Sequence, residues 1–314
     1  MTEMNTRDGI ESPRNNALAF VWRQRNILAQ ASRNLKSQMS RWQSRVLWLT
    51  VFGAAFSAGS ATAGEYISNG DEWIVRGLAA AAGVAGALAL FAGSRLLSPE
   101  TQRRFVQLRS LTEDLKSQCY LFVTSAPPYD REDAPAQLTA YSARAVSGLR
   151  MTLESLPKDA KVSSPPPTDL TIDQYIQQRI VDQAKGYYEK RAGESITKVN
   201  FWKRIALVVV GIAVVIGAVA SAGILTRAIA PWIAFLNATT LAITSYLYAE
   251  RFEYLAVSYR ATQWQLEYLY TRWQILPDDK KTTEAARELI GNCENAISIE
   301  NAAWMSEWTE KKPV

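Results

Sequence analysis

Four long stretches of the chain contain no charged residue, and they occur as two pairs. The first pair covers residues 46–64 and 77–94, and the second covers 205–225 and 228–249. A helix rises about 1.5 Å per residue and a hydrocarbon core is about 30 Å thick, so each stretch is long enough to cross a bilayer. We therefore expect an all-α membrane protein with four transmembrane helices, arranged as two helical hairpins.

A buried helical hairpin of a soluble protein is the alternative interpretation of each pair. Core helices of soluble proteins usually keep a polar face. Residues 208–220 have no such face, because this stretch consists of Val, Gly, Ile and Ala only. The pattern therefore favours a lipid environment.

The layout around the two hairpins repeats. A basic and aromatic segment precedes each hairpin, RWQSR at 41–45 and FWKR at 201–204, and such residues anchor helix ends at the membrane interface. The chain is thus predicted to contain two units of one design, residues 1–160 and 169–314, each with long amphipathic cytoplasmic helices. The Pro- and Ser-rich segment 161–168 is the predicted linker, and Thr168 or Asp169 is the expected N-cap of the next helix.

A heptad stripe of apolar side chains follows each hairpin, and such a stripe needs a partner helix. No Gly or Pro occurs from Trp232 to Leu276, which predicts one continuous helix there. Packing between the two halves of the chain and packing between protomers both account for the stripes. The residues that align between the two stripes at a constant offset are Leu108, Leu115 and Phe122 with Tyr259, Leu266 and Trp273.

Charge gives the orientation. The net charge is +5, and 33 of the 35 Lys and Arg residues lie outside the hairpins. By the positive-inside rule, the N-terminus, the middle segment and the C-terminus are cytoplasmic. Topology and contact with anionic lipids account for the basic residues, so we expect the bilayer, and no nucleic acid, as a partner.

Composition argues against enzyme chemistry. The sequence contains no histidine and only two cysteines, Cys119 and Cys293, which removes the usual general base and leaves too few ligands for a zinc site. Phosphate-binding glycine motifs are also missing. We therefore expect no catalytic activity, no metal and no cofactor, and we interpret both cysteines as structural thiols.

Polar residues inside the fourth span suggest a pore. Asn237, Thr240 and Thr244 follow one stripe of the expected helix, and copies of that stripe around an axis would line an aqueous path. The alternative is that the threonines bond back to their own helix and Asn237 bridges to another span. A coupled transporter is less well supported, because no Asp or Glu lies in any span.

The chain resembles the SLATT family of bacterial two-span effector domains, here in tandem. The features that carry the resemblance are FWKR at 201–204, YRATQWQLEYLYTRW at 259–273 and ENAISIENAAW at 294–304. The corresponding segments of the first half are RWQSR and residues 108–122, which match less well. The resemblance implies an effector of bacterial conflict systems, including anti-phage defence by abortive infection.

The resemblance further implies a homo-oligomeric ion channel in the bacterial inner membrane, which depolarises the cell when a nucleotide second messenger or an activating defence protein opens it. A membrane-anchored scaffold without conductance, whose coiled-coil helices bind a partner, is the alternative. Aromatic stacking on a nucleotide would use Tyr187, Tyr188 or Trp264. The basic residues that would hold its phosphates are Arg103, Arg104, Arg109, Lys190, Arg191, Arg251 and Arg260; each of them also suits an interfacial or packing role.

Overall fold

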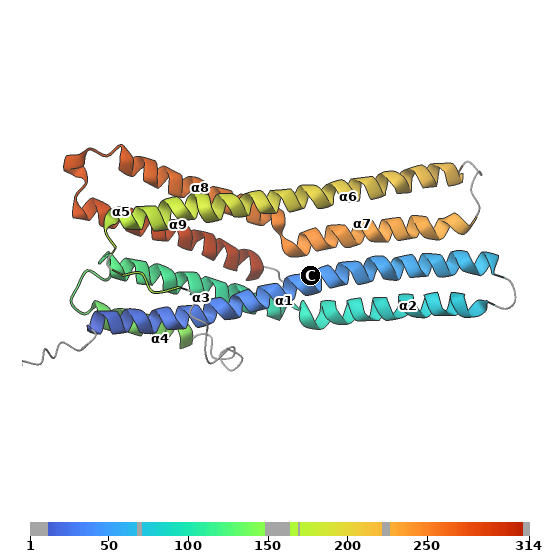
Figure 1. Ribbon diagram of the computed structural model, residues 1–314, viewed down its shortest axis with the longest axis horizontal. Coiled ribbons are helices and arrows are strands. Elements are labelled where there is room, and N and C mark those ends of the chain that lie inside the picture. The colour runs from blue at the N-terminus through green and yellow to red at the C-terminus, as the bar shows by residue number, and fades with distance from the viewer. Residues whose placement is uncertain (1–11, 68–70, 148–163, 169, 222–226, 310–314) are drawn as a thin grey trace, which may run out of the picture. The chain divides into compact units, whose positions relative to one another are not determined.

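The computed structural model is all-helical, as expected (Figure 1). It describes residues 12–67, 71–147, 164–168, 170–221 and 227–309, and these ranges contain no strand. The predicted linker is thus described at 164–168 only, and Asp169 lies outside the described residues.

The first half begins with one helix of 54 residues, α1 (Pro13–Tyr66). It is followed by α2 (Glu72–Phe91), which continues into the short π-helical turn η1 (Ala92–Leu96). Two further helices complete this half, α3 (Pro99–Val123) and α4 (Ala134–Ser147).

The second half begins with a helix in three consecutive segments, α5 (Ile172–Tyr175), the π-helical η3 (Ile176–Glu189) and α6 (Lys190–Ser221). The N-cap is Thr171 rather than Thr168, because Thr171 and Gln174 form a capping box in which each side chain accepts from the other's backbone N–H. The helices that follow are η4 (Arg227–Ile229), α7 (Ala230–Glu250), α8 (Phe252–Gln274), η5 (Asp278–Lys280) and α9 (Thr283–Thr309).

The chain forms two compact units, and each takes segments from both halves of the sequence. We call Leu35–Gln102 with Lys190–Tyr259 the hairpin unit. We call Met1–Asn34 with Arg103–Glu189 and Arg260–Val314 the bundle unit. The compact units therefore divide the chain differently from the two sequence units 1–160 and 169–314, which remain a prediction about its repeat.

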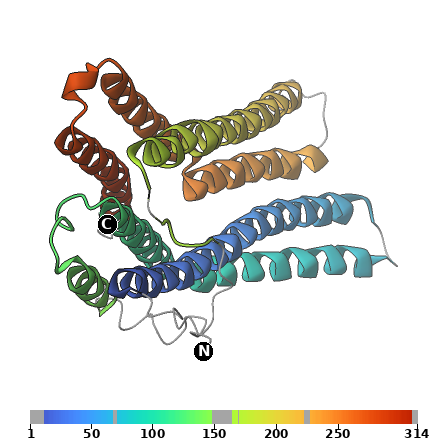
Figure 2. The same ribbon diagram turned by 60° about the vertical axis from the view of Figure 1, so that its left-hand side comes forward.

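In the hairpin unit, the second part of α1 pairs with α2, and α6 pairs with α7 (Figures 1 and 2). Small residues bring α1 and α2 close together, since a Cβ added at Gly53 would lie 3.3 Å from the Cβ of Ala85. The hydroxyl of Ser60 also donates to the carbonyl of Val75 at 3.0 Å. These contacts explain the Ala- and Gly-rich composition of the first hairpin.

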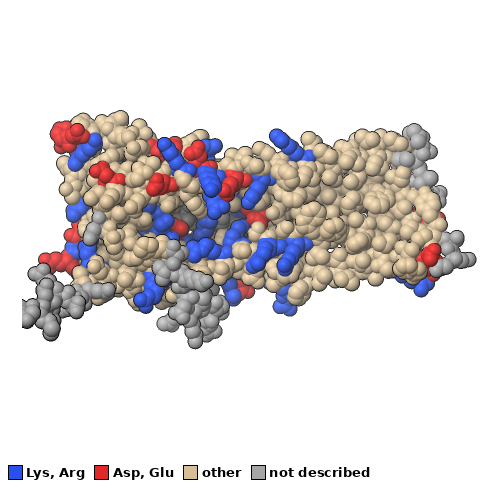
Figure 3. All heavy atoms as spheres, in the orientation of Figure 1, with Lys and Arg blue, Asp and Glu red and all other residues tan. Residues whose placement is uncertain are grey.

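Three described helices are long and apolar enough to cross a membrane, judged by length and composition: Pro13–Tyr66, Glu72–Leu96 and Ile172–Ser221. Their apolar stretches are mostly unburied, with Leu90 77% exposed on α2 and Leu207 73% exposed on α6. Figure 3 shows a long stretch of these helices without Lys, Arg, Asp or Glu on its surface. Helix α7 is not among the three, so the fourth predicted span needs a separate argument.

The predicted continuous helix over 232–276 is wrong at one residue. Arg251 adopts the left-handed conformation, with φ 53° and ψ 35°, and it separates α7 from α8. The N–H of Arg251 still donates to the carbonyl of Leu247, at 3.0 Å. Tertiary contacts hold the break on both sides, because buried Glu250 pairs with Lys36 at 2.9 Å and buried Phe252 packs edge-on against Tyr246.

The bundle unit contains the first part of α1, α3, α4, η3, most of α8 and α9. Fully buried apolar side chains from these helices form its core, and Leu138 on α4, Ile180 on η3 and Leu266 on α8 are each 0% exposed. The heptad stripes contribute to burial within the chain: Leu108, Leu115, Phe122, Tyr259 and Leu266 are 5% exposed or less, and Trp273 is half-buried.

Candidate functional site: a buried ion network

An arginine and a glutamate pair in the interior of the bundle unit. Arg179 lies on η3 and Glu294 on α9, and their side chains are 0% and 2% exposed. The Nε of Arg179 donates to Oε1 of Glu294 at 2.8 Å, and its Nη2 donates to Oε2 at 2.8 Å. This parallel pair of hydrogen bonds is the strongest geometry available to the two groups.

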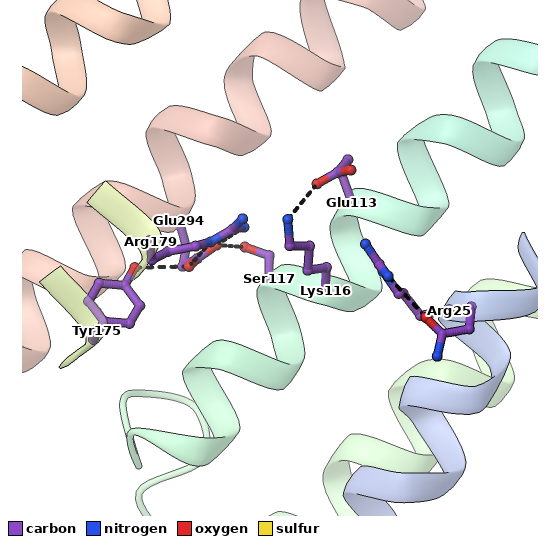
Figure 4. Close-up of polar contacts among 8 residues, drawn as sticks. Arg25, Glu113, Lys116, Ser117, Tyr175, Arg179 and Glu294 are labelled. Atoms are coloured by element: carbon purple, nitrogen blue, oxygen red, sulfur yellow. Dashed lines mark hydrogen bonds and ion pairs between the residues drawn. The ribbon is translucent and has the colours of Figure 1, made fainter. Parts of the chain in front are cut away.

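Two more donors complete the coordination of Glu294 (Figure 4). The hydroxyl of Tyr175 donates to Oε1 at 2.8 Å, and the hydroxyl of Ser117 donates to Oε2. Burial and the charge of Glu294 raise the pKa of Tyr175 well above its usual value. Burial alone would lower the pKa of Arg179, but Glu294 outweighs burial and raises it. The Glu294 carboxylate therefore accepts four hydrogen bonds and has no free role as a base.

A second group of charges lies beside this pair. Lys116 on α3 lies with its Nζ 3.8 Å from Oε2 of Glu113, one turn earlier on the same helix. The Lys116 side chain is only 15% exposed, and burial lowers its pKa to about 8, although Glu113 acts in the opposite direction. Burial acts to raise the pKa of Glu113, but the charges of Lys116, Arg179, Arg109 and Arg25 outweigh it and lower that pKa.

Helix α1 supplies one more cation. Arg25 is half-buried, its Nη1 donates to Oδ1 of Asn26 at 3.0 Å, and its guanidinium lies 5.0 Å from the ring centre of Trp22. Burial is the main cause that lowers the pKa of Arg25. Figure 4 shows Arg25, Lys116 and Arg179 on three different elements, with their charged ends directed to the same part of the bundle.

Within the described part of the chain, the buried donors Nη1 of Arg179 and Nε of Arg25 have no hydrogen-bond partner. Both carboxylates are already paired, Glu294 with Arg179 and Glu113 with Lys116. The arrangement can therefore still donate hydrogen bonds to an anion. Among the residues that the structure describes, no group of three or more His, Cys, Asp or Glu side chains gathers to hold a metal ion.

The predicted pore residues all lie on α7. Thr240 is half-buried and its hydroxyl donates to the carbonyl of Leu236 at 3.0 Å, while exposed Thr244 donates to the carbonyl of Thr240 at 2.9 Å. Asn237 is exposed on the same helix. The threonines thus bond back to their own helix, as in the alternative interpretation, and a pore lining remains a prediction.

The seven predicted ligand-binding cations do not gather in one compact unit. Arg103, Arg104, Arg109 and Arg260 belong to the bundle unit, and Lys190, Arg191 and Arg251 belong to the hairpin unit. Arg191 forms an exposed ion pair with Glu194 at 3.0 Å. Of the seven, Arg109 lies near the buried network, since its charge acts on Glu113.

The predicted aromatic residues differ in exposure. Tyr188 is 3% exposed and packs edge-on against Tyr187, with 5.2 Å between ring centres. Trp264 is 64% exposed on α8.

Sequence reasoning missed the buried network, although a signal was present. Arg179 lies between Ile176 and Ile180 on the apolar side of its helix, and Glu294 lies between Cys293 and Ile297 on the apolar side of α9. A charge inside an apolar stripe needs a buried partner, because an unpaired buried charge is costly. Two such charges of opposite sign were therefore available as a predicted pair.

Comparison with known proteins places both regions of the network in families. Residues 175–304 match the SMODS and SLOG-associating 2TM effector domain 1, SLATT_1. Residues 25–137 match a family described as a protein of unknown function, DUF4231. No curated protein and no solved structure matches the chain. The network joins the two matched regions, because Arg25 and Lys116 lie in the first and Arg179 and Glu294 in the second.

The 2TM effector match covers α6 and α7 together with the amphipathic helices on either side of them. With the apolar helices of the hairpin unit, this match supports association with a membrane. The family expected from the sequence is therefore confirmed for residues 175–304, which form a SMODS and SLOG-associating 2TM effector domain of the SLATT family.

Proposed function

We propose that this protein is a membrane effector of a bacterial conflict system, and that oligomers of its hairpin unit open an ion-conducting pore in the inner membrane. The observation that carries the proposal is the hairpin unit itself. Its helices expose apolar side chains outward, such as Leu207, Val214 and Leu241, at 73%, 64% and 67%. Surfaces of this kind are stable against lipid or against other protomers.

Contacts between α1 and α7 support a fourth span. At one end, Nε1 of Trp232 donates to the hydroxyl of Thr62 at 3.1 Å, and at the other, Nε2 of Gln43 donates to the carbonyl of Ala249 at 3.4 Å. Thr62 follows Gln43 by 19 residues, a rise of about 29 Å along a helix. Since α7 follows α1 over that whole length, α7 crosses the bilayer wherever α1 does.

The charges at the helix ends support an orientation. Basic residues close the charge-free stretches at one end of the hairpins, at Arg45, Arg95, Arg204 and Arg251. The turn of the first hairpin carries Glu65, Asp71 and Glu72 with one arginine, Arg76. The positive-inside rule then puts both termini and the middle segment in the cytoplasm.

In this proposal the stripe of Asn237, Thr240 and Thr244 lines the conducting path. One chain has too few spans to enclose water, so several copies assemble around an axis. A nucleotide second messenger or an activating defence protein opens the pore, the cell loses its membrane potential, and growth stops before phage replicate. The protein acts without catalysis.

The test is ionic current through a planar bilayer that contains the purified protein, with and without an extract of phage-infected cells. Current that appears only with the extract is the expected result. Thr240→Phe and Thr244→Phe block it, because a ring fills the path, whereas Leu207→Phe, at an exposed apolar position of α6 outside the stripe, leaves it unchanged. Growth inhibition that persists without any change in membrane potential contradicts the proposal.

Exposed aromatic and aliphatic residues on α8 favour a second candidate, a membrane-anchored scaffold without conductance. Trp264 and Tyr268 are both 64% exposed, and their spacing of four residues places them on one side of the helix, while Ile275, directly after the helix, is 75% exposed. This candidate predicts a stable complex with a partner protein that Trp264→Ser disrupts. It also predicts insensitivity to substitutions at Asn237 and Thr240.

A further inference from the structure

The interior of the bundle unit contains hydrogen-bond donors for which the described residues supply no acceptor. The Arg179 side chain is 0% exposed, and its Nη1 has no partner although Nε and Nη2 are both bonded to Glu294. The buried Nε of Arg25 is also without a partner. A buried donor without an acceptor costs about 1–3 kcal/mol, and more when it is charged. Both donors lie in the bundle unit, and the charge of Arg179 acts on Arg25, so an anion bound near both side chains would supply the acceptor that the described residues lack.

Charge in the same place is unbalanced. Glu294 is saturated by four hydrogen bonds. Glu113 remains as the carboxylate that Arg25, Arg109, Lys116 and Arg179 all act on. Three of these cations, Arg25, Lys116 and Arg179, face the two carboxylates Glu113 and Glu294, so this part of the network carries one positive charge in excess. Burial of such an excess is unfavourable unless an anion compensates it.

We propose that this network is a binding site for a phosphate-type anion, which the side chains of Arg25, Lys116 and Arg179 hold between α1, α3 and η3. The two guanidinium groups offer planar, directed donors, and the Lys116 ammonium offers a point charge, the combination that suits phosphate oxygens. This inference rests on the proposed function in one respect, in that a phosphorylated small molecule bound here is the trigger.

The site lies on helices that continue into the hairpin unit. Arg25 lies on the helix whose later part belongs to the hairpin unit, and Arg179 lies on the continuous helix 172–221 that runs on into α6. An anion that draws these side chains together acts on helices that contain two of the candidate spans. Binding is thereby coupled to the helices that are proposed to open.

The experiment measures binding directly, on the full chain in lipid nanodiscs at pH 7, by calorimetric titration with inorganic phosphate and with ATP. The expected result is saturable binding by the wild type, at least tenfold weaker in Arg25→Gln and in Lys116→Gln. The matched control is Lys185→Gln, since Lys185 is an exposed cation on η3. This variant is expected to bind phosphate and ATP with the same affinity as the wild type. Far-UV circular dichroism verifies that each variant is folded.

A second measurement varies the pH. Phosphate also titrates in this range, so the wild type is compared with Lys116→Gln on the same ligand: deprotonation of Lys116 removes one of the three charges, and the affinity advantage of the wild type shrinks severalfold between pH 7 and pH 9.5. The absence of saturable binding, or equal affinity in wild type, Arg25→Gln and Lys116→Gln, overturns the site. If binding depends on Arg25 and Lys116 but the protein conducts no current, the proposed anion site stands and the proposed pore function is rejected. Current that opens normally in both variants keeps the pore and rejects the site as its trigger.

Discussion

Arg179 and Glu294 form two hydrogen bonds of 2.8 Å in the interior of the bundle unit, although 115 residues separate them along the chain. The pair ties α9 to η3, and the hydroxyls of Tyr175 and Ser117 bond to the same carboxylate. Each charge is tolerated inside the bundle because the other is present.

Substitution of one partner should therefore reduce the free energy of unfolding more than substitution of both. Arg179→Met leaves Glu294 buried without its counterion and lowers the free energy of unfolding by about 3–5 kcal/mol. The double variant Arg179→Met with Glu294→Leu recovers most of that loss, since two apolar side chains replace two charges. Guanidinium unfolding followed by circular dichroism measures both values.

The exposed pair of Arg191 and Glu194 is the control for this prediction. Its atoms lie at a similar distance, 3.0 Å, but both side chains are solvated, so Arg191→Met changes stability by less than about 1 kcal/mol. A loss of similar size in Arg179→Met and Arg191→Met contradicts the assignment of a buried, coupled pair.

Lys116 should give the protein a distinctive response to alkaline pH. Burial lowers its pKa from the ordinary 10.5 to about 8, so between these values the unfolded chain binds more protons than the folded one. Stability from this group therefore rises with pH across that window. In Lys116→Gln the titration is gone, and its stability relative to wild type falls by up to about 3 kcal/mol from pH 8 to pH 10.5.

The difference in stability between wild type and Lys116→Gln reports Lys116 alone, because other titrating groups contribute equally to both proteins. Tyr141 and Cys119 keep their protons in the fold, since burial raises the pKa of both, so they reduce stability over the same range in both proteins. Among the charged groups that act on Lys116, Glu113 has a lowered pKa and Arg179 a raised one, so both stay ionised throughout. A pH-independent difference between the two proteins contradicts the lowered pKa of Lys116.

The two thiols should be inert in the folded protein. Cys119 and Cys293 are 0% exposed, and burial raises the pKa of Cys119 to about 12 and that of Cys293 further. Because the thiolate is the reactive form, N-ethylmaleimide at pH 8 labels both cysteines at least 100-fold more slowly in the native state than in detergent-denatured protein. The variant Ser147→Cys, at an exposed position on α4, adds one rapidly labelled thiol. Rapid labelling of native wild type contradicts this prediction.

Arg251 should accept glycine better than a β-branched residue. Its φ of 53° is unfavourable for any residue with a Cβ and most so for valine. Both Arg251→Gly and Arg251→Val lose the side-chain contacts of Arg251, so the difference in their stability measures the cost of the left-handed backbone conformation. We expect Arg251→Val to be less stable than Arg251→Gly by about 1–2 kcal/mol in thermal unfolding.

Arg260 supplies the contrast, since it lies within α8 where the backbone is helical. Arg260→Gly costs about 1 kcal/mol there. Equal stability of Arg251→Gly and Arg251→Val indicates that α7 and α8 form one unbroken helix in solution.

The apolar stretches were predictable from the sequence because the physics that places them is local. A run of about 20 uncharged residues has a strong preference for helix and for burial wherever it lies in the chain. The predicted stretch 228–249 corresponds closely to α7, residues 230–250, and 205–225 corresponds to the end of α6 at Ser221. The family resemblance was also predictable from the sequence, because it rests on short contiguous segments of aromatic and basic residues beside these apolar runs.

The break at Arg251 and the buried ion network were decided by the tertiary structure. Nothing in the residues around Arg251 disfavours a helix, and the left-handed turn is held by distant partners, Lys36 for Glu250 and Lys198 for Phe252. Likewise, Arg179 and Glu294 are each unfavourable on an apolar helix face until folding brings them together. Sequence alone therefore determined the helices and the family, whereas the pairing of charges over long chain distances, which depends on mutual desolvation, was determined only by the fold.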